Sequence, residues 1–205
     1  AMKLNAQLSR ISGVRSNIQN AISFLEVQDG ALDTAQKIMN RMIELKGLST
    51  QDPIKNAQEI DSYNDEFIDL QQQLHGLGTQ KFNGVSLFAT TTTRDGSTAA
   101  RFNNLNQNLG EDNTVDVIVS SEGNSGPKVS VNKSLLFSAL TIRTNDVSVS
   151  AAYSGTLNDA MRNQGDSNAG DMTFIAEDAA STINLTDLSV GVFTQAVQNI
   201  ATLRA

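Results

Sequence analysis

The most regular feature of the chain is a run of apolar residues spaced seven positions apart in its N-terminal part. This series consists of Ile11, Ile18, Leu25, Leu32 and Met39. A second series lies three residues after its members and consists of Val14, Ala21, Ala35 and Met42, with Gln28 as its polar member. The heptad continues without a proline and predicts one helix over residues 3–47. Such a helix, on the order of 65 Å long, needs partner helices along most of its length.

A second helix is expected over residues 53–77. Gly47 and a short polar loop interrupt the first pattern, and apolar residues return at helical spacing from Ile54 onward. Asp52 is placed to cap the new helix, with Pro53 at its first position. Because the loop is short, we expect the second helix to run back along the first. Asn83-Gly84 then predicts a tight β-turn within residues 81–88.

The middle of the chain, residues 90–171, has a different character. Thr, Ser, Gly and Asn are frequent there, and short alternating runs at 115–119, 128–131 and 146–149 predict strands in hairpins. The apolar run at 134–142 fits either a buried strand or a short helix. A strand is expected at 172–176, and apolar spacing predicts a final helix over about 188–205.

These elements define a mainly α fold with a β-rich insert (α+β), shaped as an elongated rod of long antiparallel helices with central β-hairpins. We expect residues 3–89 to form the N-terminal half of the rod, 90–171 a variable central region, and 172–205 the C-terminal part of the rod. Residues 1–2 resemble a cloning remnant. Both ends of the chain lie in uncapped helical pattern, so we expect the chain to have been cut from a longer protein.

Composition narrows the possible functions. The chain contains no cysteine and one histidine, which removes thiolate metal sites and multi-histidine centres. Its formal charge of −7 argues against a nucleic-acid partner, and no apolar run is long enough for membrane insertion. Aromatic residues make up 5% of the chain, which suits thin helical seams better than a thick round core. We therefore expect no cofactor and no metal.

Few residues suggest catalysis. His75 lies at the predicted end of the second helix, where a packed or charge-stabilising role is the simplest explanation. The segment 122–128 superficially resembles a phosphate-binding loop but lacks the required Gly-Lys-Ser/Thr element, and a hairpin turn fits it better. The carboxylates Asp61, Asp65, Glu66 and Asp69 lie on one polar helix face. The sequence thus predicts that the protein is not an enzyme.

Four segments, in order and at matching separations, resemble bacterial flagellin. They are residues 27–32 (VQDGAL), 39–45 (MNRMIEL), 81–88 (KFNGVSLF) and 193–204 (FTQAVQNIATLR). The resemblance covers about residues 3–89 and 187–205. It implies a structural subunit of the bacterial flagellar filament, secreted to the flagellum and serving motility, whose terminal segments fold into the helical rod called D1.

The resemblance also implies the partners. Other flagellin subunits pack side by side against the rod, and further terminal helices, called D0, act in export and polymerisation. If those helices are absent, the chain is expected to be monomeric. The export chaperone and the filament cap would act through the absent segments. Toll-like receptor 5, the innate-immune receptor for the family, grips a run on the first helix, and the matching positions here include Arg41, Glu44 and Leu45. Ile43 and Lys46-Gly47 depart from the family pattern, with a glycine that weakens the helix.

The leading hypothesis has two rivals. A hook–filament junction protein has a similar architecture, although the motifs at 82–85 and 198–204 favour the filament subunit. A cell-surface carbohydrate-binding flagellin homologue would use the β-rich middle. Under the leading hypothesis, the candidate subunit and receptor interface consists of Arg41, Glu44 and Leu45.

Overall fold

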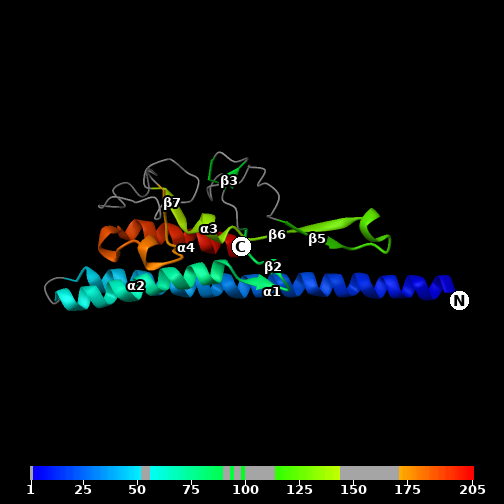
Figure 1. Cartoon of the computed structure of the whole chain (residues 1–205), viewed down its shortest axis with the longest axis horizontal. Helices are drawn as coiled ribbons and strands as arrows, with labels where there is room; N and C mark the ends of the chain where they lie inside the picture. The colour runs from blue at the N-terminus through cyan, green and yellow to red at the C-terminus, as the bar shows by residue number, and fades with distance from the viewer. Residues whose placement is uncertain (1, 52–55, 90–92, 95–97, 100–113, 144–170) are drawn as a thin grey trace.

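The computed structural model describes the chain except for residues 1, 52–55, 90–92, 95–97, 100–113 and 144–170. It is an elongated, mainly helical molecule with small antiparallel hairpins, as the sequence predicted (Figure 1). Helix α1 spans Met2–Ser49 as one continuous element and passes through Gly47. Helix α2 spans Ala57–Gly78, and helix α4 spans Val190–Arg204.

Helices α2 and α4 both pack against the C-terminal half of α1. Helix α4 runs in the opposite direction to α1, since Lys46 near the end of α1 binds the carbonyl of Leu185 while Arg204 binds Asp29. Helix α2 also runs back along α1 (Figure 1). The buried residues of the three helices face one another and include Met39, Met42 and Leu45 of α1, Phe67 and Leu74 of α2, and Phe193 and Ile200 of α4. The last helix of the chain therefore pairs with the C-terminal half of the heptad helix.

The core is anchored by phenylalanines even though the chain contains few aromatic residues. The rings of Phe67, Phe174 and Phe193 meet with centroids 5.2 to 6.4 Å apart, in tilted and edge-to-face arrangements. All three are fully buried. They come from α2, from the segment after strand β8 (Asp171–Thr173) and from α4, so the cluster ties the C-terminal part of the chain to the helices.

The N-terminal half of α1 differs from the expectation that partner helices cover most of it. Ile11 is 59% exposed and Ile18 is 41% exposed, whereas Leu32 and Met39 of the same series are buried. Within the described residues, α2 has 22 residues and α4 has 15, against 48 in α1, so they are too short to reach its first turns. The first fully covered apolar residue of α1 is Phe24.

Side-chain hydrogen bonds satisfy backbone groups at both ends of α2. Asn56 is the N-cap, and its side-chain oxygen accepts a 2.8 Å hydrogen bond from the backbone N–H of Glu59. The expected cap Asp52 and Pro53 lie outside the described residues. At the other end, the Thr79 hydroxyl donates to the carbonyl groups of His75 and Gly76. The His75 ring lies edge-on to Phe137, as expected of a packed histidine.

All described strands form two-stranded antiparallel sheets. The first pairs β1 (Lys81–Phe82) with β2 (Val85–Ser86), and the predicted turn between them has Asn83 at φ 48° and Gly84 at φ 82°. The others pair β3 (Thr93–Arg94) with β4 (Thr98–Ala99), β5 (Thr114–Ile118) with β6 (Lys128–Asn132), and β7 (Thr141–Arg143) with β8 (Asp171–Thr173).

The remaining elements are a short helix and several 3₁₀ turns. The apolar run at 134–142, which fitted either a strand or a short helix, contains both. Helix α3 (Leu136–Ala139) is followed directly by β7. Within the described part of the chain, three 3₁₀ turns span Gly123–Ser125, Ala179–Ser181 and Leu185–Asp187. The first lies within the segment that resembled a phosphate loop, which the structure shows as the connection between β5 and β6. The strand predicted at 146–149 lies outside the described residues.

Candidate functional site

The first candidate surface is formed by Arg41 on α1 and two carboxylates. The Arg41 guanidinium donates to both oxygens of Glu66 on α2, at 2.6 and 2.9 Å, and to Glu44 one turn further along α1, at 2.7 Å. Its hydrogen bonds to Glu66, and then to Glu44, raise the pKa of Arg41, and the same contact lowers the pKa of Glu66. The fork geometry fixes the guanidinium on the outer face of the α1–α2 pair.

The three residues predicted as an interface lie in different environments. The side chains of Arg41 and Glu44 are 40% and 61% exposed and are directly available to a neighbouring molecule. Leu45 is completely buried in the core between the helices. Any contribution of Leu45 to an interface therefore acts through the packing beneath it. Glu66, which sequence reasoning placed on a solvated face, is the residue that holds Arg41 in place.

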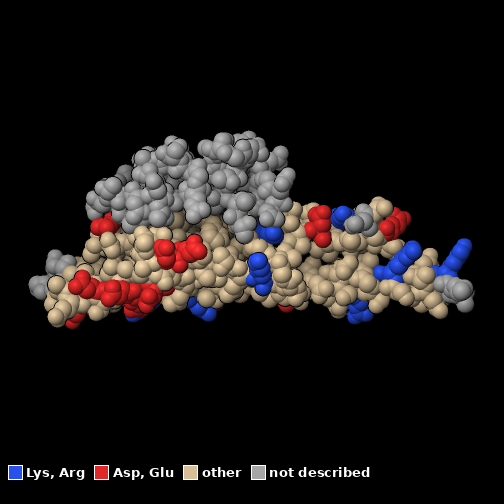
Figure 2. Space-filling view, in the orientation of Figure 1, with Lys and Arg blue, Asp and Glu red and all other residues tan. Residues whose placement is uncertain are grey.

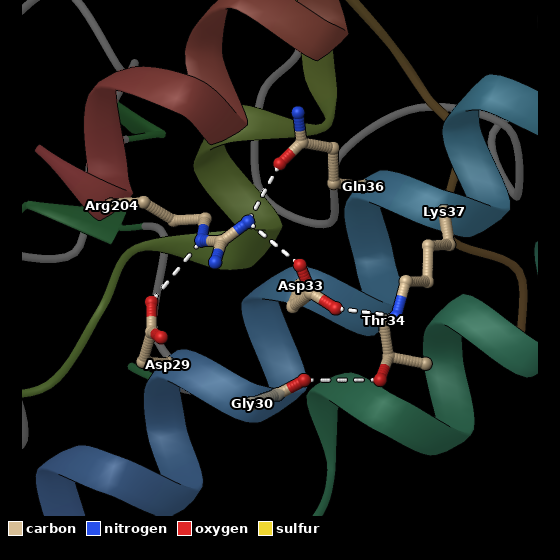
Figure 3. A network of polar contacts seen from close by, with 7 residues as sticks. All are labelled: Asp29, Gly30, Asp33, Thr34, Gln36, Lys37 and Arg204. Atoms are coloured by element: carbon tan, nitrogen blue, oxygen red, sulfur yellow. Dashed lines mark hydrogen bonds and ion pairs between the residues drawn. The ribbon is translucent and has the colours of Figure 1, made fainter.

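The second candidate surface lies at the end of α4. Arg204 donates to Asp29 at 3.1 Å, to Asp33 at 2.9 Å and to Gln36 at 2.8 Å (Figure 3). Asp29, Asp33 and Gln36 follow the i, i+4, i+7 spacing of one helix face, which was the available sequence signal for this contact. This contact was not among those predicted from the sequence. We call these four residues the terminal clamp.

Two further contacts lie on α1 beside the clamp. Lys37 binds the second oxygen of Asp33 at 2.7 Å, and the Thr34 hydroxyl donates to the carbonyl of Gly30 (Figure 3). The hydrogen bond from Lys37 is the main cause of the lowered pKa of Asp33, with Arg204 adding to it. The hydrogen bond to Asp29 is the main cause of the raised pKa of Arg204. The clamp thus joins the segment 27–32 to the segment 193–204.

A cavity of about 310 Å³ lies between α1 and two hairpins. Phe24 of α1, Phe82 beside the β1–β2 turn, and Val115 of β5 contribute apolar walls. Asn17, Asn20 and Asp116 supply polar groups, and Asn17 donates to the carbonyl of Ile118 at 3.4 Å. Over the described part of the chain, no three or more His, Cys, Asp or Glu residues are grouped so as to hold a metal ion.

Charge is unevenly distributed along the molecule. Between residues 3 and 25 the only charged residues are Lys3, Arg10 and Arg15, whereas α2 carries Glu59, Asp61, Asp65, Glu66 and Asp69. Figure 2 shows acidic side chains gathered along the lower left and basic ones at the right end, where α1 begins, with further acidic groups above α1 in the region of the β5–β6 hairpin. Among the described helices, none is both long enough and apolar enough to cross a membrane.

Comparison with known proteins agrees with these features. Residues 1–93 match the family model for the bacterial flagellin N-terminal helical region. The flagellin of Bacillus subtilis (strain 168) is 27% identical over 209 residues, which cover 99% of this chain and 60% of that protein. The chain therefore spans about 60% of the length of this relative. The N-terminal helical region and the alignment along nearly the whole chain are thus both similar to bacterial flagellin.

Proposed function

We propose that this chain is the rod-shaped structural core of a flagellar filament subunit, exported from the cell and assembled into the filament for motility. The observation that carries this proposal is the packing of α4 antiparallel to α1, closed by the terminal clamp. In this clamp, Arg204 of the flagellin-like segment 193–204 binds Asp29 of the flagellin-like segment 27–32. Flagellin is a structural protein, and we extend that role to the present chain.

The proposed mechanism is side-by-side packing of folded rods with other flagellin subunits. Each rod has its own core, since Met42, Phe67 and Phe193 are fully buried without any neighbouring molecule. A subunit built in this way brings a preformed outer face to its neighbours, so little conformational entropy is lost on packing. The exposed carboxylates of α2 and the exposed groups Arg41 and Glu44 would lie on that outer face. We also propose the export chaperone and the filament cap as partners.

A chimeric filament tests the proposal. Residues 3–204 would replace the corresponding part of Bacillus subtilis flagellin, and the chimera would be expressed in a strain lacking its own flagellin gene. We expect electron microscopy to show filaments and swarm plates to show motility, with the unmodified flagellin as the positive control. A chimera that is secreted and folded, yet forms no filament with the cap protein present, would contradict the proposal.

We further propose that Toll-like receptor 5, if it recognises this chain, contacts Arg41 and Glu44 but not Leu45 directly. This follows from the exposure of the first two side chains and the burial of the third. In a receptor reporter assay, Arg41→Ala should weaken the response more than Arg10→Ala, a matched exposed arginine on the same helix. Equal responses from the two variants would remove Arg41 from the receptor contact.

A further inference from the structure

We draw no further inference here: the strongest candidate, the cavity between the first half of α1 and the β5–β6 hairpin, has apolar walls that include Phe24, Phe82 and Val115, but nothing in the structure shows what occupies it.

Discussion

Gln71 on α2 and Ile183 in the segment before α4 bind each other twice. The Gln71 side-chain nitrogen donates to the carbonyl of Ile183 at 2.9 Å, and its oxygen accepts from the backbone N–H of Ile183 at 3.0 Å. Both residues are fully buried. The amide of Gln71 thus does for this segment what a neighbouring strand would do, which lets irregular backbone lie inside the core.

Replacing Gln71 should be costly. Gln71→Ala leaves the N–H and the carbonyl of Ile183 buried without partners, and we expect a loss of about 2–4 kcal/mol in the free energy of unfolding. Urea denaturation followed by circular dichroism measures it. Gln73→Ala, an exposed glutamine on the same helix, should change stability by less than about 0.5 kcal/mol. Similar losses in the two variants would show that the paired contact is not important for stability.

Two glycines of α2 should respond oppositely to the same substitution. A Cβ atom at Gly76 meets nothing within 4 Å, so Gly76→Ala should stabilise the helix by up to about 1 kcal/mol. A Cβ atom at Gly78 would lie 2.7 Å from the ring of Phe137, so Gly78→Ala should destabilise by about 1–3 kcal/mol. Melting temperatures of the two variants provide the measurement. A stabilised Gly78→Ala chain would mean that the Phe137 ring moves aside readily.

The terminal clamp should make stability sensitive to salt. Arg204→Gln removes the charged contacts to Asp29 and Asp33, and we expect a lower melting temperature in dilute buffer than for the wild type. The difference should shrink as added salt screens the contacts of the wild type. Arg10→Gln serves as the control, because among the described residues Arg10 forms no ion pair. A difference that persists unchanged at high salt would point to packing of the Arg204 side chain instead.

Acid should weaken the fold through three carboxylates. The pKa values of Asp33, Glu66 and Asp178 are lowered in the folded chain, by hydrogen bonds from Lys37, Arg41 and Ser181 respectively. A lowered pKa stabilises the fold fully above the ordinary value and loses that effect as pH falls through the folded value. The melting temperature should therefore stay level above pH about 5 and decline below pH about 4.

Two substitutions verify the source of this acid sensitivity. Asp33→Asn and Glu66→Gln should each reduce the decline in melting temperature between neutral and acid pH. Asp61→Asn, on the exposed face of α2, should leave the decline unchanged. A wild-type melting temperature that rises on acidification would contradict the assignment of stabilising roles to these carboxylates.

The helices could be predicted from sequence because local signals and packing agree there. The heptads gave the extent of α1, and Asn83-Gly84 gave the β1–β2 turn. Periodicity reports which residues share a helix face, but it does not report which stretch of that face is covered. For this reason Ile11 and Leu32, which are equivalent in the pattern, differ in the structure.

The contacts of the candidate site were harder to predict from the sequence. Its contacts join residues far apart in the chain, such as Arg41 with Glu66 and Arg204 with Asp29. Pairing of this kind depends on how helices are aligned along one another, and no local pattern records that alignment. Leu45 illustrates a different limit. It was predicted as an interface residue because it belongs to the flagellin-like run 39–45, but that run does not show which of its side chains point into the core. The interface role of Arg41, Glu44 and Leu45 stays a prediction.

The antiparallel pair β7–β8 has a consequence for how this chain can change over evolution. Arg143, the last residue of β7, pairs with Asp171, the first residue of β8, so the intervening chain leaves and returns at one point. Loop closure at such a point costs little more for a longer segment than for a shorter one. Sequence between these two residues can therefore lengthen, shorten or be exchanged while the rod keeps its geometry, so the two parts of the chain are free to evolve at different rates.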